Sequence, residues 1–192
     1  THFHPDHVSG MPTMLMHLWL LGRQAPLRVY GLNHCINRTE DMMLAFAWDT
    51  WPGFFPISFY RVMVRASAPV LDNPDFRITA WPTRHFIPTI GLRIENKRTG
   101  KVLAYSCDTE PIPALIDLAR DADLLIHEAA GAGEGHSSAA QAGEIATRAG
   151  AKSLYLIHYQ VWNTDPTPLI AEAQQTYAGP IYLAKDFDQY TF

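Results

Sequence analysis

The sequence predicts an α/β protein in which helices cover a sheet, and three observations support this fold class. The chain has 192 residues, of which 47% are hydrophobic, so it can bury one substantial core. Its middle part alternates apolar and polar residues, as antiparallel strands do. Its C-terminal part alternates short apolar runs with helical patterns, as layered α/β folds do. We therefore expect a single domain over residues 1–192.

The N-terminal third predicts two helices on either side of a strand. Residues 11–23, MPTMLMHLWLLGR, have a helical apolar spacing that ends at Gly22. PLRVYGL, at 26–32, predicts a short strand. Residues 37–53, NRTEDMMLAFAWDTWPG, predict a helix that begins at polar capping residues and stops at Pro52 and Gly53.

The rest of the chain predicts a hairpin followed by alternating strands and helices. FRITAWPTRH (76–85) and TIGLRIEN (89–96) alternate as strands, and the turn NKRTGK leads into a third strand, VLAYSCD, at 102–108. The later elements are a helix near 112–121, a strand at 123–128, a helix at 137–150, a strand at 153–158, a helix at 167–178 and a strand at 180–186.

Charge and composition exclude several classes of protein. The net charge of -4 offers no broad attraction for polyanions such as nucleic acid. Two cysteines, Cys35 and Cys107, are too few for a disulfide framework, so we expect a reducing, cytoplasmic location. No apolar run reaches the roughly 18 residues of a membrane span, so we expect no membrane partner.

The chain opens with a dense group of potential metal ligands. THFHPDHVSG contains H-x-H-x-D-H, formed by His2, His4, Asp6 and His7. Histidines at alternate positions of an extended segment point to the same face, while the Asp-His pair turns away and can serve a second ion. The alternatives are a solvated loop or the remnant of a purification tag. A tag would repeat one residue type, so metal binding is the better interpretation.

Four more polar residues stand where predicted strands end or a helix begins. His85, Asp108 and His158 each follow a strand, and His136 precedes the helix SSAAQAGEIA. Catalytic groups often occupy such positions. One of them alone would suggest a structural residue, but four in a chain that begins with H-x-H-x-D-H indicate a metal-dependent enzyme.

These motifs, in this order, resemble the metallo-β-lactamase fold, and the subgroup they resemble is the ribonuclease Z-like phosphodiesterases. The segments that carry the resemblance are HFIPTIGLRI, LAYSCDTEP, DLLIHEA and HSSAAQAGEIATRAGAKSLYLIH, and it covers essentially the whole chain. The segment HSSAAQAGEIA distinguishes this subgroup from the lactamases and from glyoxalase II-type thioesterases. The resemblance implies a metal-dependent hydrolase with an αββα sandwich.

The resemblance assigns a role to each candidate residue. It implies that the first metal is held by His2, His4 and His85, that the second is held by Asp6, His7 and His158, and that Asp108 bridges both ions. Imidazole and carboxylate ligands without thiolate suit zinc, manganese or iron, and we expect two zinc ions. Such a pair can hold a bridging hydroxide, which Asp6 would orient. His136 matches the histidine that assists the leaving oxygen.

Other polar residues favour structural roles. His127 and Glu128 match a family segment, but we expect them to be inward-facing structural residues. His17, on an apolar helix, and the neighbours His34 and Cys35 show no partner pattern for a metal site. Arg84, beside His85, could reach a substrate phosphate, although a solvated arginine is the preferred interpretation. The aromatic residues around Pro52 predict core packing, a dimer contact or a wall of the substrate pocket: Trp48, Trp51, Phe54 and Phe55.

Two departures from the family concern the substrate and the bridging aspartate. The tRNA-processing members insert a long basic arm between the motifs around His85 and Asp108, but here these residues are only 23 positions apart. We therefore expect a small or cyclic phosphodiester rather than nucleic acid. Cys107 stands where the family usually has glycine, so its side chain could alter the approach of the backbone to the metals.

A third departure concerns the start of the fold. In the family, several strands precede the H-x-H-x-D-H loop, whereas Thr1 begins directly at that loop. The predicted fold class is thus an N-terminally incomplete metallo-β-lactamase sandwich. We expect the natural protein to be longer by several strands, or the exposed sheet edge to be covered by a homodimer mate or by another polypeptide that supplies them.

The motifs and the departures from the family leave three functions to be tested. The first is a dinuclear metal-dependent phosphodiesterase acting on a small substrate. The second is a tRNA 3′-end processing endonuclease that obtains its missing arm elsewhere. The third is a non-catalytic fragment of the fold, against which the complete set of seven ligand candidates argues.

Overall fold

The computed structural model describes residues 1–190, and the chain divides into two compact units, residues 1–63 and 64–192. Within residues 1–190, every helix is too short or too polar to cross a lipid bilayer.

The first unit consists of helices packed against a two-stranded parallel sheet. Its elements are α1 (Pro5–Val8), α2 (Gly10–Leu20), β1 (Leu27–Leu32), α3 (Asn33–Ala45), the 3₁₀ turn η1 (Trp48–Thr50) and β2 (Ile57–Val62). β1 and β2 run parallel, with Leu27 opposite Ile57, because α3 and η1 form the crossover between them. Leu15, Met43 and Phe55 are buried at the centre of this unit.

The helix predicted from residue 37 begins earlier than expected. α3 starts at Asn33, directly after β1, and its N-cap is Leu32, whose side chain makes no capping hydrogen bond. The expectation of a polar cap was therefore wrong, because the helix continues from the strand without a loop. The sequence patterns also did not predict α1, β2 or the strand β3 of the second unit.

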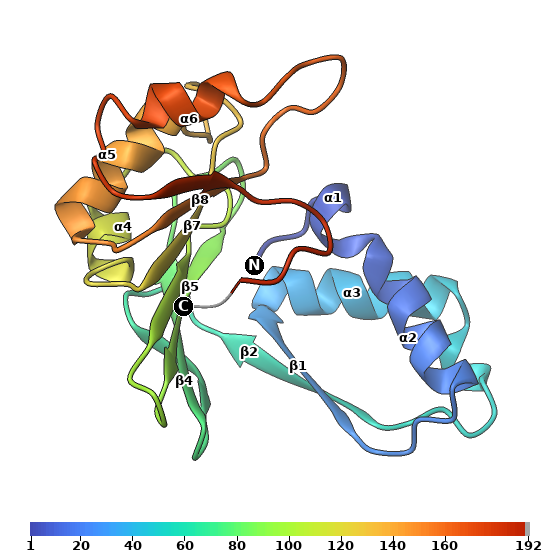
Figure 1. Ribbon diagram of the computed structural model, residues 1–192. Helices are drawn as coiled ribbons and strands as arrows, with labels where there is room; N and C mark the ends of the chain where they lie inside the picture. Colours follow the sequence, from blue (N-terminus) through green and yellow to red (C-terminus); the bar gives the residue numbers. More distant parts are fainter. Residues whose placement is uncertain (191–192) are drawn as a thin grey trace. The chain divides into compact units, whose positions relative to one another are not determined.

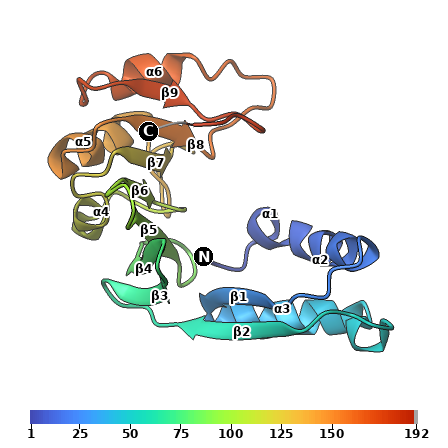
Figure 2. The ribbon, with the colours of Figure 1, turned by 60° about the horizontal axis from the view of Figure 1, so that its bottom comes forward.

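The second unit is built on a seven-stranded sheet with the order β3-β4-β5-β6-β7-β8-β9, which Figure 2 shows in succession. The strands are β3 (Ala68–Asp72), β4 (Phe76–Pro82), β5 (Ile90–Asn96), β6 (Val102–Tyr105), β7 (Leu124–Glu128), β8 (Leu154–Ile157) and β9 (Ile181–Leu183). The pairs from β3 to β6 are antiparallel, and those from β6 to β9 are parallel. The predicted hairpin followed by strand-helix alternation is thus confirmed.

The strand directions place several strand ends at one edge of this sheet. Because β4 and β6 are both antiparallel to β5, they run in the same direction, and β7 and β8 follow β6. The carboxyl ends of β4, β6, β7 and β8 therefore lie at the same edge. The loops that leave this edge can bring polar side chains together.

Three helices cover one face of the seven-stranded sheet: α4 (Pro113–Leu118), α5 (Ala139–Ala149) and α6 (Pro168–Ala173) (Figure 1). Their core includes Leu118, Leu125 and Leu156. α5 begins with a capping box of Ser138 and Gln141. It ends at Gly150, in a left-handed conformation, where the sequence pattern predicted its stop.

Candidate active site

The loops at this edge of the sheet bring three of the predicted metal ligands together. His85 follows β4, Asp108 follows β6 and His158 follows β8. The Nε2 atoms of both histidines lie 3.7 Å from Oδ2 of Asp108. The aspartate therefore stands between two imidazoles, which is the position that a shared ligand requires.

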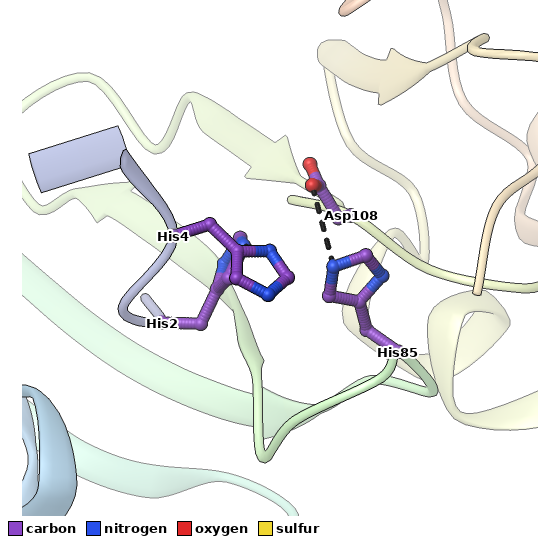
Figure 3. Close-up of side chains that lie close together, drawn as sticks. All are labelled: His2, His4, His85 and Asp108. Carbon is purple, nitrogen blue, oxygen red and sulfur yellow. Dashed lines mark hydrogen bonds and ion pairs between the residues drawn. The ribbon is translucent and has the colours of Figure 1, made fainter. Parts of the chain in front are cut away.

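The hydrogen bonding of His85 supports a cation at this position. Its Nδ1 lies 2.8 Å from the carbonyl oxygen of Gly135 and donates to it, so in the neutral ring Nε2 carries the lone pair. This lone pair faces the Asp108 carboxylate (Figure 3). Two acceptors that face one another repel unless a positive charge lies between them. Two ligand atoms of one tetrahedral zinc ion lie about 3.4 Å apart, close to the spacing seen here.

Two residues of the site have an unusual backbone conformation. Cys107, directly before Asp108, has φ +54°, and His158 has φ +58°. Side chains other than glycine rarely adopt this left-handed region, and such strain is common at functional sites. It also explains why glycine suits the position of Cys107: the chain turns there through a conformation that glycine adopts without strain.

His136 is held beside these ligands by a buried carboxylate. Its Nδ1 lies 3.0 Å from Oε1 of Glu128, and its ring centroid lies 4.9 Å from that of His85 and 5.6 Å from that of His158. The Glu128 side chain is only 1% exposed. Glu128, His136 and His158 also offer ligand atoms close enough to hold one metal ion. His136 thus has two chemically reasonable roles, as an acid or as a ligand.

Glu128 is buried and inward-facing, as the sequence analysis expected, and its carboxylate also contacts the candidate residue His136. Its carboxylate accepts hydrogen bonds from the backbone N–H groups of Thr109 (3.0 Å), Ala130 (2.9 Å) and Ser137 (3.2 Å). Burial raises the pKa of Glu128 above its ordinary value, although these hydrogen bonds and His136 oppose the shift. Its position at the end of β7, at the same edge as Asp108, was the signal that could have identified it.

In the first unit, the opening motif brings its own ligands together. His2 and His4 lie in the extended segment before α1, with Nε2 of His2 3.1 Å from Nδ1 of His4 (Figure 3). Asp6 and His7 lie in α1, where Oδ2 of Asp6 is 3.2 Å from Nε2 of His7. The ring of His7 also lies 4.2 Å from that of His2, centroid to centroid, so the Asp-His pair does not turn away from the alternating histidines as the sequence analysis expected.

Three of the remaining candidates have structural environments. His127 is fully buried in the second unit, and Nδ1 donates to the carbonyl of Glu128 at 2.8 Å. His34 contacts the buried Cys35 at 3.3 Å within α3, and His17 is exposed on α2. Neither His127 nor the His34–Cys35 pair belongs to any group of ligand atoms that could hold a metal among residues 1–190.

The aromatic residues around Pro52 form a packed cluster in the first unit. Phe54 stacks on Phe55 with 4.5 Å between ring centroids, and Trp48 and Trp51 each lie 5.5 Å from Phe54. Phe55 is 2% exposed. Core packing therefore accounts for Phe55, while the half-buried Trp48, Trp51 and Phe54 also line a pocket at the surface of this unit.

The side chain of Arg84 is 70% exposed, as expected for a solvated arginine, and it also forms an ion pair with Glu110. Its Nε lies 3.2 Å from Oε2 of Glu110, and the other oxygen of this carboxylate, Oε1, accepts the N–H of Gly135 at 3.1 Å. Glu110 and Gly135 were not among the predicted site residues. These contacts join the loops after β4, β6 and β7, and no local sequence pattern predicts them.

Comparison with known proteins agrees with this arrangement. A family model described as the beta-lactamase superfamily domain matches residues 1–159. Ribonuclease Z of Myxococcus xanthus is 28% identical, with 100% of this chain and 78% of the relative covered. Ribonuclease BN of Cronobacter sakazakii is 27% identical over 246 positions, covering 97% of this chain and 78% of the relative.

A solved structure gives the same result for the fold. The metallo-beta-lactamase fold protein YhfI of Bacillus subtilis matches with a TM-score of 0.76 and 25% identity, covering 96% of this chain and 73% of that one. The predicted α/β class and the ribonuclease Z-like resemblance are thereby confirmed. Because the family model matches more than half of the sequence, the chain belongs to the beta-lactamase superfamily, with a ribonuclease Z-like metallo-β-lactamase fold.

Proposed function

We propose that this protein is a metal-dependent phosphodiesterase that acts on small or cyclic phosphodiesters. The observation that carries the proposal is the placement of Asp108 between the Nε2 atoms of His85 and His158, with His136 and its buried partner Glu128 in the same set of loops. Paired imidazoles on one carboxylate provide the ligands, and a histidine beside them provides a proton donor.

The ligand set that we propose follows the family resemblance. His2, His4 and His85 would hold one ion, Asp6, His7 and His158 a second, and Asp108 would be shared. The donor atoms are imidazole nitrogens and carboxylate oxygens, which suit zinc, and also manganese or iron. When bound, such ions activate water and neutralise charge at the phosphorus.

The chain's own residues then orient the nucleophile and supply a proton. Asp6 would accept a hydrogen bond from the oxygen nucleophile and orient it toward the phosphorus. The carboxylate of Glu128 stabilises the protonated ring of His136 through Nδ1. Nε2 of His136 can therefore give its proton to the leaving oxygen as the P–O bond breaks.

Substrate size is proposed from the short connection between two motifs. Only 23 positions separate His85 from Asp108, and the structure fills them with the loop after β4, the β5–β6 hairpin and no further element. The alignment with ribonuclease BN spans 246 positions although this chain has 192 residues, so the relative carries additional residues within the matched region. Without a basic arm and with a net charge of -4, a long polyanion would be held weakly.

The second candidate function is tRNA 3′-end processing, which the names of the ribonuclease Z relatives favour. A third, a non-catalytic fragment of the fold, would leave the paired ligands without a use. Three further expectations also belong to the proposal: that residues 1–192 act as one catalytic domain in the cytoplasm, that two ions bind, and that the chain forms a homodimer.

The experiment that tests the proposal combines metal analysis with two substrates. We expect close to two zinc ions per purified chain and hydrolysis of bis(p-nitrophenyl) phosphate, with little cleavage of a precursor tRNA. Cleavage of the tRNA alone would support the ribonuclease Z function instead. A chain without metal and without either activity would support the non-catalytic fragment.

A further inference from the structure

We propose that Glu110 is a positioning residue for the candidate active site, because it fixes the peptide units at Gly135 and thereby sets the ring of His85. The inference rests on the proposed function, in which His85 holds a metal ion. Within residues 1–190, the carboxylate of Glu110 contacts Arg84 and the N–H of Gly135, not the proposed metal ligands.

Glu110 lies where two loops of the site are already joined. The hydroxyl of Thr83 donates to the carbonyl of Asp108 at 3.0 Å, and the N–H of Glu110 donates to the carbonyl of Arg84 at 2.8 Å. These bonds connect the loop that carries His85 to the loop that carries Asp108. The side chain of Glu110 then extends the connection to a third loop, through its hydrogen bond with the N–H of Gly135.

Gly135 is held from both sides. Its N–H donates to Oε1 of Glu110 at 3.1 Å, and its carbonyl accepts Nδ1–H of His85 at 2.8 Å. Both peptide planes that meet at this residue are therefore fixed. Gly135 has φ +75°, and a Cβ atom there would lie 3.0 Å from Nδ1 of His85, so the position needs glycine.

The carbonyl of Gly135 determines which nitrogen of His85 can bind a cation. Because Nδ1 donates its hydrogen to this carbonyl, Nε2 carries the lone pair that faces Asp108. Hydrogen bonds of this kind orient metal-binding histidines in general. The same peptide unit leads directly into His136, so a rotation of Gly135 would displace two residues of the site.

Glu110 acts on the site through its hydrogen bond to Gly135 rather than through its ion pair with Arg84. The side chain of Arg84 is 70% exposed, and exposed ion pairs contribute little. A neutral acceptor at position 110 should therefore preserve the function. Glutamine provides one, because its carbonyl oxygen can accept the N–H of Gly135.

The experiment compares Glu110→Ala and Glu110→Gln with Glu134→Ala in the full chain. Glu134 is exposed and lies next to Gly135, so its substitution removes the same charge from the same neighbourhood without removing the hydrogen bond. The first measurement is the ring tautomer of His85 in metal-free protein, from ¹H–¹⁵N correlation spectra assigned with His85→Gln. The second is the zinc affinity, measured by competition with a chelator.

We expect His85 to show a single Nδ1–H tautomer in the wild type, in Glu134→Ala and in Glu110→Gln. In Glu110→Ala we expect a mixture of tautomers and a zinc affinity roughly 10-fold weaker, at the lower end of what outer hydrogen bonds contribute. Unchanged spectra and zinc affinity in Glu110→Ala would overturn the inference. A Glu110→Gln variant as defective as Glu110→Ala would also overturn it, since the charge would then be the cause.

The tautomer measurement separates this inference from the proposed function. If the wild type binds no zinc and hydrolyses no phosphodiester, but the tautomer of His85 responds to Glu110→Ala as expected, the positioning contact stands and the proposed function fails. If the wild type binds zinc and is active while Glu110→Ala matches Glu134→Ala in both measurements, the proposed function stands and the inference fails.

Discussion

Nδ1 of His136 lies 3.0 Å from Oε1 of Glu128, and three backbone N–H groups converge on the same carboxylate. A buried carboxylate in this position serves two purposes. It joins the loops that follow β6 and β7, and it fixes the ring of His136 through Nδ1. The same carboxylate therefore holds the loops together and orients the histidine that we propose as the proton donor.

Replacing His136 by alanine separates its two reasonable roles. If His136 acts as the acid, His136→Ala keeps both metal ions, and the turnover of bis(p-nitrophenyl) phosphate falls by roughly 10²–10⁴-fold. The measurements are zinc content and kcat on the same preparation. Loss of zinc in this variant would instead make His136 a ligand, together with Glu128 and His158.

Asp108→Ala should lose the metal ions that His136→Ala keeps. Asp108 lies 3.7 Å from the Nε2 atoms of two histidines, so its removal takes away the ligand that both proposed ions share. We expect zinc content to fall to nearly zero while the chain remains folded. Asp117→Ala is the matched control, because Asp117 is exposed on α4 and pairs only with Arg120 on the surface. Retention of two ions by Asp108→Ala would contradict the bridging role.

The parts of the structure that the sequence predicted are those with local signals. α5 was predicted over residues 137–150 with its stop at Gly150, because the helical pattern ends at a glycine. His85, Asp108 and His158 were predicted as a group, because each follows a strand and the strands share one direction. The start of α3 was not predicted, since the polar residues at 37–41 resemble a cap but lie inside the helix.

Contacts between loops that are distant in sequence could not be predicted in this way. Glu110 and Gly135 are 25 positions apart, and nothing near either residue identifies the other. The positioning role proposed for Glu110 depends on the arrangement of the loops after β4, β6 and β7, which the strand order fixes. The contact between Glu128 and His136 was not predicted for a similar reason, because His136 comes from the next loop.

Gly135→Ala should damage the site more than an equivalent change elsewhere. The new Cβ would lie 3.0 Å from Nδ1 of His85 and 3.1 Å from Cε2 of Phe86, at a residue with φ +75°. Gly100→Ala is a matched control: Gly100 has φ +73°, but nothing lies within 4 Å of its Cβ position.

Both glycine variants should lose about 1–2 kcal/mol of stability from the left-handed backbone. Only Gly135→Ala should lose about 1–3 kcal/mol more from crowding and bind zinc more weakly, because His85 is displaced. Denaturant unfolding and a chelator competition measure the two effects. Equal zinc affinity in the two variants would show that His85 does not depend on this contact.

The buried His127 predicts a loss of stability in mild acid. Burial lowers its pKa from the ordinary 6.5 to about 4, against the hydrogen bond that Nδ1 donates to the carbonyl of Glu128. Between these two values the unfolded chain binds more protons at this position than the folded chain. Folding is therefore favoured above pH 6.5, and the advantage is lost as the pH falls toward 4, by at most about 3 kcal/mol.

Unfolding of the metal-free chain at pH 7 and pH 5 tests this prediction. His127→Asn removes the titration, while its amide can still donate to the carbonyl of Glu128, so we expect a smaller difference in stability between the two pH values than in the wild type. The neighbouring Glu128, whose pKa burial raises, contributes with the opposite sign in both proteins and cancels in the comparison. His17→Asn, at an exposed position of α2, is the control. An identical pH dependence in His127→Asn and the wild type would mean that water reaches the ring of His127, and that this histidine is not part of a dry core.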